Sequence, residues 1–240
     1  RDVVDVDKQD DRAGSRLFAV ETLAHHHEQH PQRTSLGVYL YFMGSLFDAW
    51  QSRKMSISTR VLIALRCHFF LQTWRAHVVA HPDHHTKHNF ISRECEDILR
   101  TVCHSLIALV MSYRKYYPDC PLLPWLHSTE PDEHVYGVTR MVKPDFTYAD
   151  FLEIVPKVTH YLMGMFATMG STERASLTAS GYWHTWTKNS DIDLTAAVCW
   201  PTDNEIARLS AIALDDVRCI MSAVGINVNR VIHLPRQKPR

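Results

Sequence analysis

Residues 58–80 read STRVLIALRCHFFLQTWRAHVVA and place apolar side chains on nearly every side of a helix. A helix that is apolar all round must be covered by several neighbours. His81-Pro82 ends this segment, because proline lacks a backbone donor and restricts the residue before it. The sequence therefore predicts a central helix at 58–80 with other helices packed around it.

The flanking segments supply those neighbours. Residues 34–54 and 92–117 repeat apolar side chains every three or four positions, the pattern of an amphipathic helix. A further helix is expected at about residues 12–28. We therefore predict a mainly α fold with little β structure, in which a helical bundle spans about residues 12–117.

The C-terminal half has its own helix starts. Three threonines are each followed, three positions later, by an acidic residue, which is the pattern of a capping box. These pairs are Thr129 with Asp132, Thr147 with Asp150, and Thr202 with Glu205. Gly225 is expected to end the last helix, because glycine readily adopts the left-handed conformation found there. Residues 170–200 show no periodicity.

The composition argues against several classes of function. Lysine and arginine number 26 and aspartate and glutamate number 26, so the net charge is zero and does not indicate binding of nucleic acid or an anionic membrane. The six cysteines include no C-x-x-C pair, which favours reduced, intracellular thiols. No segment has the ~18 apolar residues of a membrane span. There is no P-loop, G-x-G-x-x-G, H-E-x-x-H or nucleophile elbow, so no ordinary hydrolase or nucleotide-binding enzyme is indicated.

The strongest candidate site lies in residues 128–140. Pro131 suits the first turn of a helix, and Glu133, Gly137 and Arg140 then share one face at i, i+4 and i+7. The opposite face is apolar and is expected to pack inward; it comprises Val135, Val138 and Val142. A phosphate or a metal ion could approach Glu133 beside Gly137. The alternative is an ordinary solvated face, which carries the same residue types.

A histidine-rich loop offers a second candidate. Its four imidazoles belong to His81, His84, His85 and His88. A zinc site needs tetrahedral ligands on a scaffold that holds them, and a loop interrupted by Pro82 gives no such geometry. Zinc is therefore the weaker alternative, and structural or incidental roles are favoured.

Three stretches resemble the C-terminal half of P-element-type transposases, in particular the transposase-like proteins of mushroom-forming fungi. Residues 7–18, DKQDDRAGSRLF, look like the start of the helical insertion of that family. Residues 41–53, YFMGSLFDAWQSR, are similar to its Phe-Asp-x-x-Asn-Ser-Arg signature, with Gln51 in place of asparagine. Residues 129–140, TEPDEHVYGVTR, followed by DFTYADF at 145–151, look like the block around the last catalytic glutamate.

The resemblance implies an RNase H-like core in which three carboxylates hold divalent metal ions, Mg²⁺ or Mn²⁺. Glu133 matches the third acid and would be both catalytic residue and metal ligand, while the first two acids are expected upstream of Arg1. Arg140, Arg236 and Lys238 are candidates for contacts with DNA phosphates.

The resemblance also implies an organisation and a location. Residues 1–127 would form the helical insertion-like domain and residues 128–240 the helices and tail of the catalytic core. The expected function is DNA cleavage and strand transfer in the nucleus, with DNA as partner, no membrane association and a possible homo-oligomer. The alternative is a catalytically inactive helical scaffold or interaction protein derived from a transposase.

Overall fold

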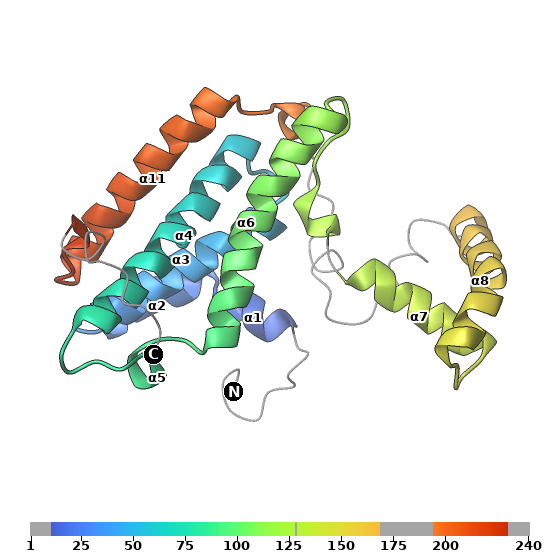
Figure 1. Ribbon diagram of the computed structural model, residues 1–240, viewed down its shortest axis with the longest axis horizontal. Helices are drawn as coiled ribbons and strands as arrows, with labels where there is room; N and C mark the ends of the chain where they lie inside the picture. The colour runs from blue at the N-terminus through green and yellow to red at the C-terminus, as the bar shows by residue number, and fades with distance from the viewer. Residues whose placement is uncertain (1–10, 128, 169–193, 230–240) are drawn as a thin grey trace. The chain divides into compact units, whose positions relative to one another are not determined.

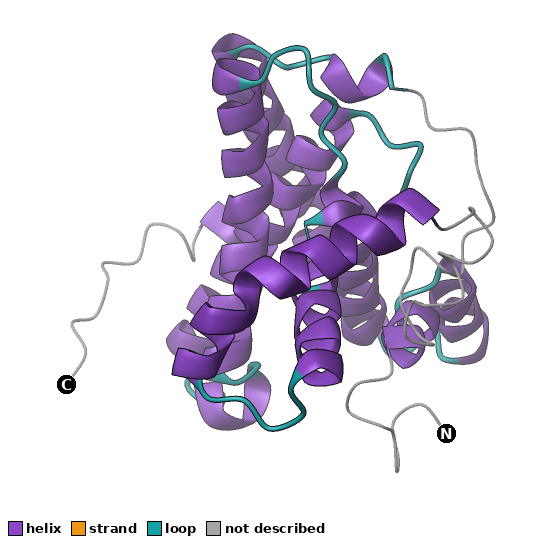
Figure 2. Cartoon of the chain, turned by 90° about the vertical axis from the view of Figure 1, so that its right-hand side faces the viewer, coloured by secondary structure: helices purple, strands orange, loops and turns teal. Residues whose placement is uncertain are grey.

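The computed structural model describes residues 11–127, 129–168 and 194–229, and every regular element in these ranges is a helix (Figures 1 and 2). The elements in order are α1 Asp11–Leu17, α2 Val20–Gln29, α3 Thr34–Gln51, α4 Ile57–Ala80, α5 Thr86–Asn89, α6 Arg93–Tyr116, η1 Pro124–Leu126, α7 Glu130–Val142, α8 Tyr148–Thr168, η2 Ala196–Val198 and α11 Asp203–Ala223. The prediction of a mainly α fold with little β structure is confirmed. The chain divides into two compact units, one holding α2 to α6 with α11 and the other holding α7 and α8.

The first unit is built around α4, which contacts α3, α6 and α11 (Figure 1). Several α4 side chains are fully buried, namely Val61, Ala64, Cys67 and Leu71. The prediction of a central helix here is confirmed. The helix begins slightly earlier than expected, because Ser56 is the cap and its hydroxyl accepts a hydrogen bond from the Thr59 amide at 3.2 Å.

The last helix belongs to this bundle. The predicted capping box is present in α11: the Glu205 amide donates to the Thr202 hydroxyl, and the Thr202 amide donates to the Glu205 carboxylate at 2.7 Å. Gly225 has a φ of 79° and follows the helix, as expected. The buried face of α11 comprises Leu209, Ala213, Val217 and Met221.

This packing differs from the predicted division at residue 127, which grouped residues 203–223 with those from 128 onward. The buried face of α11 lies against α4, which has apolar side chains on several sides and needs a cover there. Burial of complementary apolar faces, and not nearness in sequence, sets the grouping.

The prediction of one helix at about residues 12–28 is wrong in one respect. The structure has two helices there, α1 and α2, with a break between them. Ala19 is extended, with φ −68° and ψ 151°, and precedes the first residue of α2. Phe18 packs against the core of the bundle. The break therefore lets the chain turn while Phe18 stays in contact with the core.

Two threonines at helix starts make no capping hydrogen bond through their side chains. Thr34 is already the first residue of α3, whose N-cap is Arg33, and its hydroxyl donates to the Pro31 carbonyl at 3.3 Å. Thr129 is the N-cap of α7, but its side chain makes no capping hydrogen bond. For α7 the predicted helix start is correct within one residue, but the predicted capping bond of Thr129 is not formed.

The contact of Gly44 with Phe18 leads to a stability prediction. A Cβ at residue 44 would lie 2.7 Å from the Phe18 carbonyl oxygen, which belongs to the backbone and has little room to move. Gly44→Ala is expected to lower the free energy of unfolding by about 1–3 kcal/mol in urea denaturation. Gly14→Ala is the control, because a Cβ there meets nothing within 4 Å. Equal stability of the two variants would contradict the prediction.

Candidate functional site

Helix α7 positions the predicted site through its apolar face, which packs on α8. Val138 is 5% exposed, and Val135 and Val142 are partly buried, so the predicted inward face is confirmed. Thr139 is also buried on this helix, and its hydroxyl donates to the Val135 carbonyl at 2.7 Å. These contacts fix which side of α7 faces solvent within this unit.

Glu133, Gly137 and Arg140 are all exposed. Their spacing puts them on one face of α7. A Cβ built on Gly137 has no heavy atom within 4 Å, so the space beside Glu133 is open within the described chain. The carboxylate of Glu133, next to this open space, can receive a cation, and the guanidinium of Arg140, about two helical turns further along, can receive a phosphate. Arg236 and Lys238 lie outside the described residues.

A carboxylate is the oxygen ligand that Mg²⁺ and Mn²⁺ prefer, so Glu133 fits the expected group chemically. Among the described residues, no group of three or more histidine, cysteine, aspartate or glutamate side chains could hold a metal ion. A metal centre at Glu133 therefore needs further ligands beyond those that the described residues bring to it.

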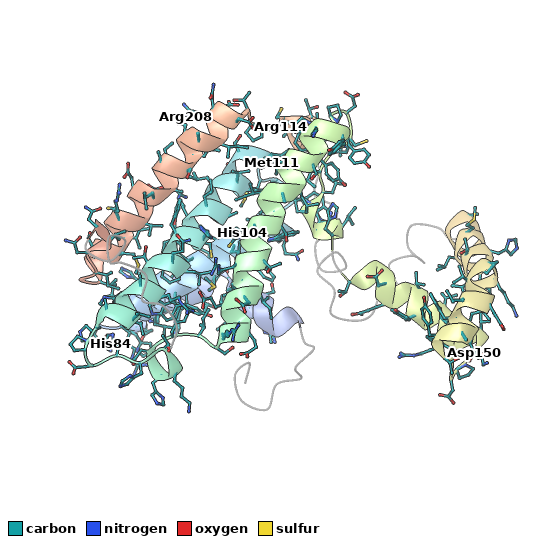
Figure 3. All side chains as sticks on the ribbon, viewed as in Figure 1. His84, His104, Met111, Arg114, Asp150 and Arg208 are labelled. Carbon is teal, nitrogen blue, oxygen red and sulfur yellow. The ribbon has the colours of Figure 1, made fainter. Side chains whose placement is uncertain are left out.

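Asp150 is the acid at the start of α8 (Figure 3), and its carboxylate serves as a cap. It accepts hydrogen bonds from the Thr147 amide and hydroxyl, both at 2.8 Å, and pairs with Lys143. Lys143 and then Thr147 lower the pKa of Asp150 to about 2. The predicted capping pair of Thr147 and Asp150 is confirmed, and this carboxylate is already engaged.

Of the four histidines in the weaker zinc candidate, two pack against each other and the other two are exposed. His81 and His84 stack with ring centroids 3.9 Å apart, and the ring of His77 from α4 lies 5.5 Å from that of His84. His85 and His88 are exposed. Burial, His84 and His81 together lower the pKa of His77. His77 was not among the predicted candidates, although it lies one helical turn before His81.

A second histidine pair links α4 and α6. His68 Nδ1 and His104 Nε2 are 3.0 Å apart, a hydrogen bond in which the two rings have opposite roles (Figure 3 labels His104). Burial, with smaller effects from His104 and Arg100, lowers the pKa of His68 from 6.5 to about 4. His68 is therefore neutral at pH 7. No local pattern in the sequence predicts a contact between two histidines that are 36 positions apart.

The lowered pKa of His68 predicts that the folded protein loses stability when the pH is lowered. Between pH 6.5 and about 4 the unfolded chain protonates residue 68 while the folded chain keeps it neutral, so the unfolded state binds more protons. Stability is expected to fall as the pH is lowered through this window, by about 1–2 kcal/mol from His68 because its partial exposure screens the effect. Urea midpoints at pH 7 and pH 5 measure this loss. His68→Gln is expected to reduce it; a loss of the same size in His68→Gln and in the exposed control His25→Gln would refute the assignment.

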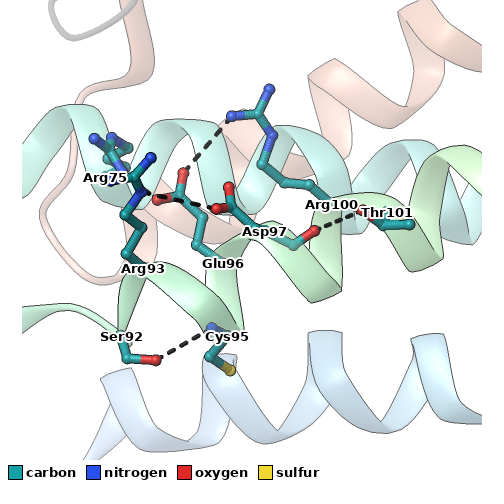
Figure 4. A network of polar contacts seen from close by, with 8 residues as sticks. All are labelled: Arg75, Ser92, Arg93, Cys95, Glu96, Asp97, Arg100 and Thr101. Atoms are coloured by element: carbon teal, nitrogen blue, oxygen red, sulfur yellow. Dashed lines mark hydrogen bonds and ion pairs between the residues drawn. The ribbon is translucent and has the colours of Figure 1, made fainter.

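Charged groups at the start of α6 have structural partners (Figure 4). The Ser92 hydroxyl accepts from the Cys95 amide at 3.1 Å, so Ser92 caps α6 at the start of the segment predicted to be helical. Glu96 is only 5% exposed on its side chain and pairs with Arg75 of α4 and, at 3.8 Å, with Arg100. The pair with Arg75 attaches α6 to α4, whereas the pair with Arg100 lies within α6.

Comparison with known proteins assigns no relative to this chain. No protein-family model matches it, and neither the curated proteins nor the solved structures give a significant match. In the described ranges, none of the helices has both the length and the hydropathy needed to span a membrane.

Proposed function

We propose that this chain is part of a metal-dependent DNA transposase and supplies Glu133 as the last of three metal-binding carboxylates. The observation that carries the proposal is the open face of α7, where Glu133, Gly137 and Arg140 are all exposed. This face lies within residues 129–140, the block that resembles the region around the last catalytic glutamate in P-element-type transposases.

The chemistry assigns a separate role to each residue. Divalent metal ions, when bound, activate the attacking oxygen and stabilise the leaving oxygen in phosphodiester cleavage. Glu133 supplies a negatively charged oxygen ligand, and the absence of a side chain at Gly137 leaves room beside it. Arg140, one turn further along α7, is placed to pair with a DNA phosphate. The first two acids are proposed to precede Arg1.

Three positively charged side chains are proposed to contact the phosphates of DNA. Because the net charge of the chain is zero, a DNA contact must depend on local groups, for which Arg140, Arg236 and Lys238 are proposed. The bundle of α2 to α6 then corresponds to the helical insertion before the last acid. DNA as substrate also leads to the proposal of a nuclear location.

The experiment uses the full-length protein, including the segment upstream of Arg1. Strand cleavage of a DNA substrate is measured with Mg²⁺, with Mn²⁺ and with a chelator, for the unchanged protein and for Glu133→Gln. Cleavage that requires the metal and is lost in the variant supports the proposal. Metal-dependent cleavage that persists in Glu133→Gln ends it.

A second candidate function is a catalytically inactive helical scaffold derived from a transposase. It is favoured by the many charged groups that already have structural partners, such as Glu96 with Arg75, Arg66 with Asp216, and Asp150 with Lys143. The two candidates differ in the upstream segment: two aspartates borne on strands there favour the enzyme, and their absence favours the scaffold.

A further inference from the structure

A hollow of about 440 Å³ lies where the end of α2 meets α3 and α11. Its walls are mostly apolar and include Leu23, Val38, Tyr41 and Ile220, together with the imidazoles of His26 and His30. Small-molecule sites typically have volumes of about 300–1,000 Å³, apolar walls and a few polar groups. The size and the lining of this hollow match that description.

His26 is the polar group that this packing leaves unsatisfied. Its side chain is buried, the residue being 8% exposed, and its Nε2 has no hydrogen-bond partner among the described residues. The Nδ1–Cε1 edge of the ring lies against α3, where a Cβ at Gly37 would stand 3.4 Å from Nδ1 and 3.5 Å from Cε1. Buried polar atoms in proteins nearly always have a partner, so an unpartnered nitrogen of a residue that lines a hollow points to a ligand group or an ordered water that the ring reaches when it turns.

The surroundings of His26 decide which ligand group fits. The hollow lies at the C-terminal end of α2, where the helix dipole gives negative partial charge and disfavours a carboxylate or a phosphate. A neutral hydroxyl both donates and accepts, so it can pair with Nε2 in either tautomer of the imidazole. An aromatic body satisfies the apolar walls, since a cavity of only about 150 Å³ already holds a benzene ring.

We propose that this hollow binds a small phenol whose hydroxyl hydrogen-bonds to Nε2 of His26. Because Nε2 is shielded from solvent, binding includes a turn of the imidazole away from Gly37 and toward the ligand. In this complex Leu23, Val38 and Ile220 contact the aromatic ring of the phenol and a short alkyl chain that it carries. This binding site is separate from α7 and does not depend on the proposed nuclease chemistry.

Titration of the whole chain with 4-propylphenol, followed by the ¹⁵N NMR signals of the histidine rings, tests the proposal. Saturable binding is expected to shift the signal of His26 Nε2. Propylbenzene has the same body without the hydroxyl and is expected to bind about fivefold to tenfold more weakly. His26→Phe is expected to weaken 4-propylphenol by a similar factor, whereas His25→Phe, at an exposed position of the same helix, is expected to change affinity less than about twofold.

A second variant keeps the test decisive if His26→Phe does not fold. Thr34 is exposed and lines the hollow, so Thr34→Trp is expected to fill it and abolish binding while His26 stays in place. Equal affinity for propylbenzene and 4-propylphenol, or no saturable binding, would overturn the proposal. So would a shift at His84 in place of His26, because His84 lines a different hollow of about 370 Å³ with Trp74 and His77.

Discussion

Glu133→Gln is expected to reduce metal-dependent strand cleavage by the full-length protein by about 10³-fold or more. The substitution keeps the size and the hydrogen-bonding oxygen of the side chain but removes its charge. A bound metal ion contributes several kcal/mol to stabilisation of the transition state, and each 1.36 kcal/mol corresponds to a tenfold change in rate. Glu133 is exposed on α7, so the fold and the thermal midpoint are expected to remain unchanged.

Two further variants separate loss of the ligand from a general loss of negative charge. Glu153→Gln removes an exposed carboxylate from α8 and is expected to leave cleavage unchanged. Gly137→Leu keeps Glu133 but fills the open space beside it, and is expected to slow cleavage. If Glu153→Gln is as damaging as Glu133→Gln, the effect belongs to overall charge and the role of Glu133 as a ligand is refuted.

The helices that were predicted well have signals that are local in the sequence. Ser92 and Thr202 each cap a helix through a residue only three positions away, so the interaction can be recognised from spacing alone. The all-round apolar pattern of residues 58–80 likewise identifies a central helix without knowledge of its neighbours. Such features depend on short-range periodicity.

The features that were missed join positions far apart in the chain. The break before α2 depends on how Phe18 meets Gly44, and the imidazole pair depends on the rotation of α4 against α6. No local pattern specifies either contact. The same holds for the candidate site: periodicity places Glu133 and Arg140 on one face, but which acids converge on Glu133 is decided by tertiary structure.

Arg60→Met is expected to lower the free energy of unfolding by about 2–4 kcal/mol, measured by urea denaturation. Arg60 is only 2% exposed, and its guanidinium donates to the carbonyls of Ala49 and Ser52 at the end of α3. Hydrogen bonds from a charged donor contribute about 1.5–3 kcal/mol each, and the last carbonyls of a helix otherwise have no partner. Methionine fills much of the same volume, so the loss measures the polar contacts more than a cavity.

The ionisation of Arg60 sharpens this prediction. Burial lowers the pKa of Arg60 to about 10, so the guanidinium is still charged at pH 7. Its positive charge interacts favourably with the C-terminal end of α3, which carries negative partial charge. Arg93→Met is the matched control: Arg93 is 87% exposed and lies 3.9 Å from Asp97, so its removal is expected to change stability by less than about 0.5 kcal/mol. A similar small effect in both variants would show that the two carbonyls find other partners, and the expected contribution of the Arg60 hydrogen bonds to stability would be wrong.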